Sequence, residues 1–473
     1  MIKYSNDIKE IIALINSQFT NETTNDNCVC CISKITEKID DEYLMARSEC
    51  FKIELHTNEV LFSSIRKLSS ICNQDKVECS KCPINKYCNH YIANKQNNYD
   101  INMPKIIDLF CGAGGLSLGF TQAGYITSLA NDIEPCCIDT YSHNHPEVPR
   151  KHIVLGDIND VIANIKSLMR FKNTDVLIGG PPCQGFSMAN RQRLIDDPRN
   201  HLYKSYIQVL ELTQPRFFVM ENVKGMLSAS NQVMEDFKSV GYTVKAKVLN
   251  AKDFGVPQNR ERLIFIGNRI GYDNDRIFNR INELCSKIPE YTLADALYGL
   301  RPLSASRIKN STSVETEECG RTIDVAMGAV NEYINTINQN RHISIVFNHK
   351  ARYNNDRDIE IFGRLNPGDK SNDPKIADIM PYSRRNNIFK DKYFKLEPDK
   401  VCKTITAHMK FDCNMYIHPY QARGLTPREA ARVQSYPDDY FFRGAYTKTY
   451  MQIGNSVPPM LGRIIAKAIK EVL

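Results

Sequence analysis

Seven short apolar runs recur between residues 105 and 267 and predict the strands of one sheet. Runs of this length that are rich in Ile, Val, Leu and Phe are typical of buried strands. Polar stretches with helical spacing separate them at intervals of roughly 20–40 residues, which favours a mostly parallel, doubly wound α/β sheet. The predicted strands cover residues 105–110, 125–130, 152–155, 175–178, 217–220, 243–249 and 262–267.

The alternation of strands and helices holds in only part of the chain. None of the 23 glycines precedes Gly112, and the apolar spacing in residues 8–19 predicts a helix, so we expect a small helical domain at the start. After residue 268 the pattern breaks into polar, charge-mixed segments, which indicates an inserted domain. Regular structure returns with a helix near Thr426 and Pro427. The predicted organisation is a helical domain at 1–100, a catalytic core at 101–267, an insertion at 268–400 and a segment at 401–473 that completes the core.

Composition narrows the class of protein. With 42% hydrophobic and 24% charged residues the chain resembles ordinary globular proteins, and no apolar run approaches the roughly 18 residues of a membrane span. We therefore expect no membrane partner and a cytoplasmic location, where clusters among the 16 cysteines indicate metal binding or catalysis rather than disulfides. Residues 1–100 carry a net charge of −2, which leaves +9 for the remainder, the part expected to meet a polyanion.

Glycines follow the first predicted strand and indicate a nucleotide-like ligand. The turn reads Cys111-Gly112-Ala113-Gly114-Gly115, and glycine lets the backbone approach a ligand closely. The next two strands end in Asp132 and Asp157, where acids accept hydrogen bonds from a ribose and an adenine amino group. No phosphate-binding lysine motif accompanies the glycines, which favours S-adenosylmethionine (AdoMet) over ATP. Capping of a loop end is the alternative role of each acid.

Two further strand ends carry reactive side chains. Cys183 follows the predicted strand 175–178 within a turn stiffened by glycine and prolines, so it is a candidate nucleophile. The strand 217–220 ends in Glu221, which offers a carboxyl group at the same edge of the sheet. A buried structural cysteine is the alternative for Cys183.

The ordered motifs of the chain resemble those of the C5-cytosine DNA methyltransferases, from residue 104 to the last residue. The stretches that carry the resemblance are Asp108-Leu109-Phe110-Cys111-Gly112-Ala113-Gly114-Gly115, Pro181-Pro182-Cys183-Gln184-Gly185-Phe186-Ser187, Glu221-Asn222-Val223, Gln258-Asn259-Arg260-Glu261-Arg262, Leu425-Thr426-Pro427-Arg428-Glu429-Ala430-Ala431-Arg432 and Gly454-Asn455-Ser456-Val457-Pro458.

The resemblance implies an AdoMet site built from eight positions. In such a site Phe110 stacks on the adenine ring, Asp132 binds the ribose, and Asp157 accepts from the adenine amine. The amino-acid end of the cofactor meets the segment near the last motif. The full predicted set is Phe110, Gly112, Gly114, Asp132, Ile133, Asp157, Asn455 and Ser456.

The resemblance also implies a covalent mechanism on double-stranded DNA. A Cys183 thiolate adds to cytosine C6, Glu221 hydrogen-bonds the ring, and Arg262, with Arg260 nearby, holds O2. The cytosine must first be flipped out of the stack. The insertion at 268–400 is expected to recognise the target sequence.

A cysteine cluster precedes the predicted core. Cys72, Cys79, Cys82 and Cys88 have the spacing C-x6-C-x2-C-x5-C, which resembles the iron–sulfur loop of endonuclease III-type glycosylases. The resemblance implies a [4Fe-4S] cluster; a four-cysteine zinc site and unligated cysteines are the alternatives. The glycine-free sequence lacks that family's glycine-bearing hairpin, so glycosylase activity is not inferred.

Three functions remain open from the sequence. The first is a DNA cytosine-5 methyltransferase, monomeric on DNA, that acts in a bacterial or phage modification system beside a separate restriction endonuclease. The second keeps the fold but methylates tRNA. The third is a non-catalytic DNA-binding protein. The large insertion favours the enzyme that recognises double-stranded DNA over the tRNA enzyme, because a domain of this size suits contacts in the DNA grooves.

Overall fold

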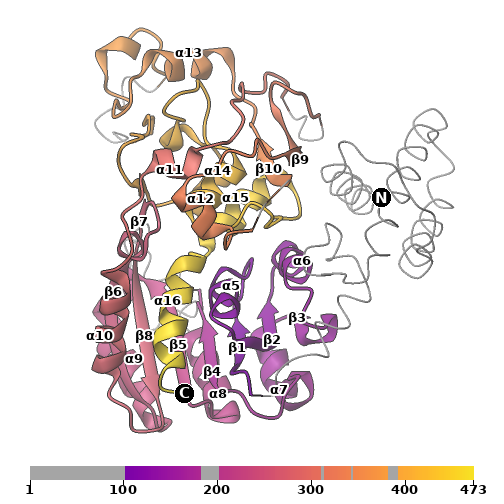
Figure 1. Ribbon diagram of the computed structural model, residues 1–473, viewed down its shortest axis with the longest axis vertical. Helices are drawn as coiled ribbons and strands as arrows, with labels where there is room; N and C mark the ends of the chain where they lie inside the picture. Colours follow the sequence, from indigo (N-terminus) through magenta and orange to yellow (C-terminus); the bar gives the residue numbers. More distant parts are fainter. Residues whose placement is uncertain (1–101, 183–201, 310–313, 342, 344, 382–391) are drawn as a thin grey trace, which may run out of the picture.

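The structure is a computed structural model that describes residues 102–182, 202–309, 314–341, 343, 345–381 and 392–473. Two parts are visible in Figure 1: a layered sheet domain, and above it a region of short helices, hairpins and loops. We call the second part the upper region; it comprises α11 to α15 with β7, β9, β10 and β11. None of the helices within the described ranges is long and apolar enough to cross a membrane.

The sheet domain contains seven strands in the order β3-β2-β1-β4-β5-β8-β6. All seven predicted runs are strands, with ends displaced by three residues or fewer. The bounds are β1 Lys105–Leu109, β2 Ile126–Asp132, β3 Ile153–Leu155, β4 Val176–Gly179, β5 Phe217–Val223, β6 Thr243–Asn250 and β8 Glu261–Asn268.

One strand departs from the parallel arrangement. β8 lies antiparallel to both of its neighbours, β5 and β6, so the sheet is mixed. Only ten residues join β6 to β8, too few for the helical crossover that a parallel pair requires. The prediction of a mostly parallel sheet therefore holds for β1 to β5 and is wrong for this edge.

Successive side chains on each strand point to opposite faces of the sheet and pack into two apolar cores. On β1, Ile106 points into one core and Ile107 into the other, and both are fully buried. The first core packs under α5, α10 and α16, and the second under α7, α8 and α9. A sheet covered on both faces explains why its strands are almost continuously apolar. The helices of the sheet domain are α5 Gly115–Gln122, α6 Pro135–Asn144, α7 Ile158–Leu168, α8 Leu202–Thr213, α9 Ser230–Ser239, α10 Asn274–Cys285 and α16 Pro459–Lys470.

Close glycine contacts bring the last helix onto the first. A Cβ atom added to Gly119 of α5 would lie 2.5 Å from the carbonyl oxygen of Pro459 in α16. A Cβ atom added to Gly462 would lie 3.1 Å from Leu116. Because these helices meet so tightly, α16 completes the layer that α5 begins, as Figure 1 shows.

The upper region is built from shorter elements. Its bounds are β7 Gln258–Asn259, α11 Leu293–Leu297, β9 Gly320–Val325, α12 Glu332–Ile337, β10 Ile345–Lys350, α13 Asp356–Arg364, β11 Cys402–Lys403, α14 Pro427–Val433 and α15 Tyr446–Asn455. The helix predicted near Thr426 is confirmed as α14. Thr426 caps it, and the Glu429 side chain accepts from the Thr426 amide in return, which completes a capping box.

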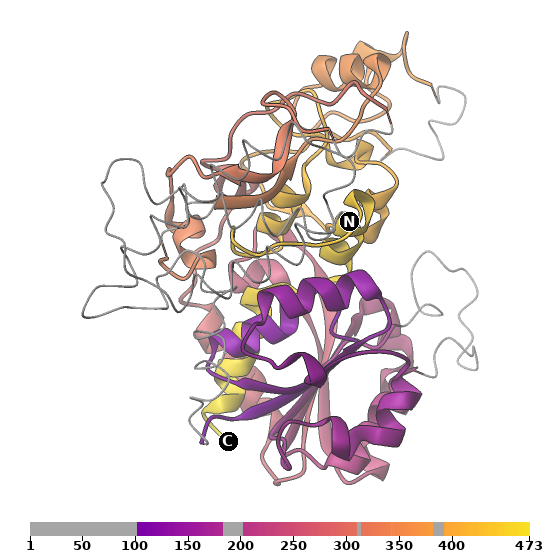
Figure 2. The ribbon, with the colours of Figure 1, turned by 90° about the vertical axis from the view of Figure 1, so that its right-hand side faces the viewer.

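The predicted boundary at residue 268 does not coincide with the edge of the sheet domain. α10 falls inside the range predicted as an insertion, yet its apolar face, with Ile277, Phe278 and Ile281, is buried in the first core. Figure 2 shows the two parts from the side, with the sheet below and the upper region above. Residues 1–100, the predicted helical domain, lie outside the described residues.

Candidate active site

A cleft of about 600 Å³ opens at the carboxyl ends of β1, β2, β4 and β5, the edge where open α/β sheets bind their ligands. Ten of the site residues predicted from the sequence line it: Phe110, Gly112, Asp132, Ile133, Asp157, Glu221, Arg260, Arg262, Asn455 and Ser456. Ile133 is 65% exposed. The sheet therefore brings together residues that are separated by more than 300 positions in sequence.

The turn after β1 is shaped by left-handed backbone. Phe110 has φ 55°, Gly112 φ 53° and Gly114 φ 83°. A Cβ atom on Gly112 would meet nothing within 4 Å, so this glycine faces open space in the cleft. Gly114 does not line the cleft; a Cβ there would approach Tyr141 and His145 at 2.8 Å. Gly114 thus permits close packing behind the turn, while Gly112 borders the ligand space.

Asp132 is fixed by the glycine turn. Its Oδ2 accepts a hydrogen bond from the Gly112 amide and its Oδ1 one from the Glu134 amide, both at 2.8 Å. Burial raises the pKa of Asp132. A carboxylate offers about four acceptor positions, so two backbone donors leave capacity for the hydroxyl groups of a ligand.

Asp157 has a second role beside the cleft. It is the exposed N-cap of α7, and its Oδ1 accepts from the Asn159 amide and from Asn159 Nδ2, both at 2.8 Å. The capping role considered from the sequence is therefore present, in a residue that also lines the cleft.

Glu221 and Arg262 form an ion pair across β5 and β8. Glu221 Oε1 lies 2.9 Å from Arg262 Nε, and the two side chains are 12% and 16% exposed. In the antiparallel register Arg262 faces Val223, so Glu221 lies diagonally opposite on the same face of the sheet. The pairing leaves a carboxyl group and a guanidinium side by side in the cleft.

Asn222 holds the neighbouring strand end. Its Nδ2 donates to the Pro181 carbonyl oxygen at 3.0 Å, which ties the residues after β4 to the end of β5. Gly180 also approaches Glu221, since a Cβ on this glycine would lie 3.0 Å from Glu221 Oε2. Cys183 follows directly after Pro182 and lies outside the described residues, as do Cys72, Cys79, Cys82 and Cys88.

Arg260 is buried and hydrogen-bonds to three backbone carbonyls. Its Nη1 donates to the Ile405 carbonyl at 2.8 Å, and its Nη2 donates to those of Gly454 at 3.1 Å and Ser456 at 2.8 Å. Burial, followed by the charge of Arg262, lowers its pKa well below the usual range. The guanidinium therefore binds three backbone segments of the cleft wall together.

Some cleft residues were not singled out from the sequence. Asn222 is not among the predicted site residues. Its place directly after Glu221 in the same motif could have marked it as one. Asp108 also lines the cleft; burial raises its pKa to about 7, and it accepts a hydrogen bond from Ser117. Cys137, Met451 and Gln452 also line the cleft, and no sequence pattern marked them.

No group of three or more metal-ligating side chains lies together in the described ranges. This result leaves the N-terminal cysteine cluster aside, because those residues are not described.

Comparison with known proteins agrees with this site. The family model for C-5 cytosine-specific DNA methylase matches residues 104–471. The type II methyltransferase M1.HphI of Haemophilus parahaemolyticus is 35% identical over 394 residues, which cover 82% of this chain and 91% of the relative. The type II methyltransferase M.DdeI of Desulfomicrobium norvegicum is also 35% identical, over 393 residues that cover 77% of this chain and 88% of the relative.

A solved structure has the same architecture. A candidate DNA modification methyltransferase encoded within an E. coli prophage superposes with a TM-score of 0.60 and 26% identity, covering 78% of this chain and 99% of that chain. The fold is thus the α/β methyltransferase fold with a mixed seven-stranded sheet. The chain belongs to the C-5 cytosine-specific DNA methylase family, and it is a DNA (cytosine-5-)-methyltransferase.

Proposed function

We propose that this methyltransferase acts on a flipped-out cytosine in a specific duplex sequence through a covalent adduct at Cys183. The observation that carries the proposal is the shared strand edge: the Glu221–Arg262 pair at 2.9 Å, and the Asn222–Pro181 hydrogen bond at 3.0 Å that tethers the turn leading to Cys183. A nucleophile, an acid and a cation at one edge are the groups that C5 methylation requires.

The proposed cofactor is AdoMet, which supplies an electrophilic methyl group. The cleft residues fit it, because Gly112 leaves open space at the turn and Asp132 retains acceptor capacity. Phe110 offers an aromatic face, Asp157 an exposed carboxylate and Asn455 an exposed amide in the same cleft. Ser456 supports this wall through its carbonyl, which accepts from Arg260.

The proposed chemistry begins with the Cys183 thiolate, which adds to C6 of the cytosine and forms a carbon–sulfur bond. The electron pair at C5 then attacks the methyl carbon of the sulfonium; the sulfur–methyl bond breaks, and the neutral thioether leaves with that electron pair. A base removes the C5 proton, and elimination of the thiolate restores the aromatic ring. Glu221 donates a proton to N3 of the cytosine and so stabilises the electron-rich adduct. Arg262 orients Glu221 and donates a hydrogen bond to O2 of the cytosine.

Arg260 is proposed to position the site. Its guanidinium is engaged with three backbone carbonyls, so its contribution to catalysis passes through the shape of the cleft wall. We expect Arg260→Lys to lower both the affinity for AdoMet and the rate of turnover. A lysine ammonium lacks the planar guanidinium group and cannot donate to all three carbonyls at once.

Sequence recognition is assigned to the upper region within residues 268–400, and the last segment, 401–473, is proposed to complete the core. Packing of α10 in the first core supports a recognition unit that starts after this helix. The relatives named type II methyltransferases support a role in restriction-modification, beside a separate endonuclease, in a bacterial or phage-infected cytoplasm. We propose that the chain binds DNA as a monomer.

Labelled methyl transfer tests the function. Duplex DNA is expected to accept methyl groups from labelled AdoMet, and tRNA is expected to accept none, since the matched family is a DNA methylase. Bisulfite sequencing of DNA from cells that express the chain would then identify the target sequence. Methylation of tRNA with no transfer to DNA would refute the proposed substrate.

The N-terminal cysteines are proposed to bind a [4Fe-4S] cluster through Cys72, Cys79, Cys82 and Cys88. The C-x6-C-x2-C-x5-C spacing supports it. Protein purified without oxygen should be brown and contain about four irons per chain. Colourless protein with one zinc and no iron would replace the cluster with the zinc alternative and leave the methyltransferase assignment intact.

A further inference from the structure

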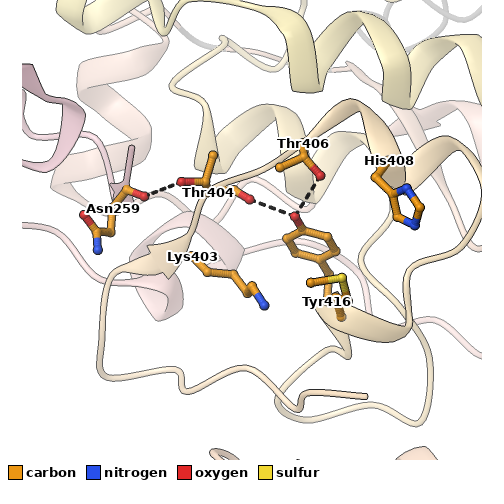
Figure 3. Close-up of a pocket in the computed structure, with 7 residues that line it drawn as sticks. Asn259, Lys403, Thr404, Thr406, His408 and Tyr416 are labelled. Atoms are coloured by element: carbon orange, nitrogen blue, oxygen red, sulfur yellow. Dashed lines mark hydrogen bonds between the residues drawn. The ribbon is translucent and has the colours of Figure 1, made fainter. Parts of the chain in front are cut away.

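Two clefts of similar volume differ in what lies behind their walls. The second cleft, of about 580 Å³, lies beside β7 and shares no lining residue with the active-site cleft (Figure 3). Lys403 pairs in register with Asn259 where β11 joins β7, and the Tyr416 hydroxyl donates to the Thr404 carbonyl at 2.7 Å. None of the described residues that line this cleft is acidic. The active-site cleft instead has a buried acid, Asp108, whose carboxylate is hydrogen-bonded to side chains behind the wall.

Three buried side chains lead away from the active-site cleft in a hydrogen-bonded chain. Asp108, on β1, lines the cleft and is 1% exposed. Its Oδ2 accepts a hydrogen bond from the Ser117 hydroxyl of α5, and Ser117 Oγ accepts one from the Tyr141 hydroxyl of α6 at 2.8 Å. A serine hydroxyl has a single hydrogen, so Ser117 cannot donate to both neighbours. While Asp108 is ionised, Tyr141 is therefore the donor to Ser117, and Ser117 is the donor to Asp108.

Tyr141 also packs directly behind the glycine turn. Its ring stacks on that of His145, with ring centroids 4.3 Å apart, and a Cβ atom on Gly114 would lie 2.8 Å from both side chains. His145 Nε2 lies 3.3 Å from the Tyr440 hydroxyl, which donates to the Ala113 carbonyl in the same turn. Tyr141 is thus packed against the turn that follows β1 and linked by hydrogen bonds to the acid that precedes this turn.

The surroundings of Asp108 place its titration near neutral pH. Burial raises its pKa to about 7, the hydrogen bond from Ser117 opposes this shift, and the charge of Asp132 on β2 adds to it. Further titratable side chains near the carboxylate are neutral at neutral pH, because burial raises the pKa of each; they are Cys111, Tyr141, Tyr206 and Tyr436. Asp108 is consequently sensitive to the loss of a single hydrogen bond that favours its charge.

The cofactor proposed for this cleft interacts best with the ionised acid. AdoMet carries two cationic groups, a sulfonium and an ammonium, and a protonated carboxyl group has no charge to attract either of them. A hydrogen bond donated to a carboxylate favours its ionised form, and a donor hydroxyl is strengthened when its own oxygen accepts a hydrogen bond. The Tyr141 hydroxyl therefore supports the charge on Asp108 through Ser117.

We propose that Tyr141 is a positioning residue of the cofactor site, which acts through Ser117 to orient the Asp108 carboxylate and keep it ionised for the cationic cofactor. Tyr141 does not line the cleft, so it reaches the ligand only through its neighbours. The inference rests on the proposed function, AdoMet-dependent methyl transfer, and adds to it a residue of α6 that no motif of the sequence marked.

The pH dependence of AdoMet binding gives the first test. Calorimetry on the full-length protein measures Kd from about pH 6 to about pH 9, which brackets the pKa of about 7 at Asp108. Wild-type Kd should fall as pH rises through this range, because Asp108 loses its proton. Tyr141→Phe keeps the ring and removes the hydroxyl, so Kd at pH 7 should rise roughly two- to tenfold. The midpoint of the pH profile should move to higher pH, and Ser117→Ala should move it further in the same direction.

Tyr125→Phe provides the matched control. Tyr125 is also a buried tyrosine, but its hydroxyl donates to the Ala466 carbonyl of α16 at 3.0 Å and it does not line the cleft. The same loss of a buried hydroxyl at this position should leave Kd and its pH profile at wild-type values. A Tyr141→Phe profile that coincides with the wild-type profile would overturn the inference, as would equal changes in the two phenylalanine variants.

A double-mutant cycle gives the second test. Asp108→Asn cannot ionise at this position, so Tyr141→Phe should have no further effect on Kd in that background. Any pH dependence that comes from Asp132 remains in both members of the pair. An equal effect of Tyr141→Phe with and without Asp108 would overturn the inference while leaving methylation intact. A wild-type protein that neither binds AdoMet nor transfers methyl groups would overturn the proposed function and this inference with it.

Discussion

The sheet domain and the upper region are stabilised by different chemistry. The strands β1, β4 and β5 are held by fully buried aliphatic and aromatic side chains on alternating faces. The upper region instead buries charged side chains: Arg423 pairs with Glu429 through both carboxylate oxygens, at 2.6 and 2.8 Å, and Arg432 pairs with Asp438 at 2.6 Å. Apolar side chains of α11, α12 and α14 are also buried there, in the same apolar cluster as the first core of the sheet, so the buried ion pairs add to apolar packing in this region.

The active site lies where these two kinds of structure meet. Glu221 and Arg262 project from the apolar sheet, and Arg260 reaches from β7 and β8 to carbonyls of the upper region and of the segment 454–456. The proposed catalytic groups therefore lie on the sheet, and Arg260 links them to a wall built from other segments. The predictions below test that arrangement.

The largest expected effect is on stability of the upper region. Arg423→Met leaves the Glu429 carboxylate buried and unpaired, which should lower the free energy of unfolding by about 3–5 kcal/mol. The chain has no tryptophan, so circular dichroism during chemical denaturation is the suitable measurement. Arg364→Met breaks exposed contacts to Glu360, Asp378 and the Lys375 carbonyl, and it should lower the free energy of unfolding far less. Similar losses for the two variants would contradict the comparison.

The second prediction concerns turnover. Glu221→Gln removes the proposed proton donor but keeps the shape of the side chain, so kcat for methyl transfer to DNA should fall about 10²- to 10³-fold. AdoMet affinity should change little, since the proposed cofactor contacts lie on other strands. A variant that turns over near the wild-type rate would exclude Glu221 from the chemistry.

The third prediction concerns the cofactor. Asp132→Ala should weaken AdoMet binding about ten- to a hundredfold, because hydrogen bonds to a charged acceptor contribute roughly 1.5–3 kcal/mol. Calorimetry measures this directly, with Asp160→Ala on exposed α7 as the control. Unchanged affinity in Asp132→Ala would indicate that the ribose partner lies elsewhere, with Glu134 the next candidate.

The last prediction is a pH dependence of the upper region, to which two buried histidines contribute. Burial lowers the pKa of His349 to about 4 and that of His418 to about 3. Between about pH 6.5 and 4 the unfolded chain therefore binds protons that the folded chain refuses, so stability falls as pH falls. Each histidine contributes at most about 1.4 kcal/mol per pH unit in this window. A free energy of unfolding that stays constant from pH 7 to 5 would contradict the burial of these neutral rings.

The sheet could be predicted from sequence because its strands carry their own signal. Continuous apolar runs marked β1 to β6 and β8, and motif residues at their ends located the cleft. The antiparallel direction of β8 was not predicted. The direction of a strand depends on the length of its connection and on the strands it pairs with, which an apolar run does not indicate.

The upper region and the supporting contacts could not be predicted in the same way. Arg260 meets carbonyls near residues 405 and 455, and Asn222 meets Pro181, across separations that no local pattern encodes. Lys403 likewise lacked a signal, because its place beside Asn259 arises from the pairing of β11 with β7. Contacts between side chains and distant backbone require the folded chain.

The central claim, covalent catalysis at Cys183 with the participation of Glu221 and Arg262, is tested most directly by trapping. A duplex with 5-fluorocytosine at the target position should form a stable complex in the presence of AdoMet, because fluorine cannot leave C5 as a proton does and elimination is blocked. Mass spectrometry of the digested complex should place the nucleotide on the peptide that contains Cys183, and Cys183→Ala should form no complex and transfer no methyl groups while still binding AdoMet. An adduct on another residue, or methyl transfer by Cys183→Ala near the wild-type rate, would contradict the account.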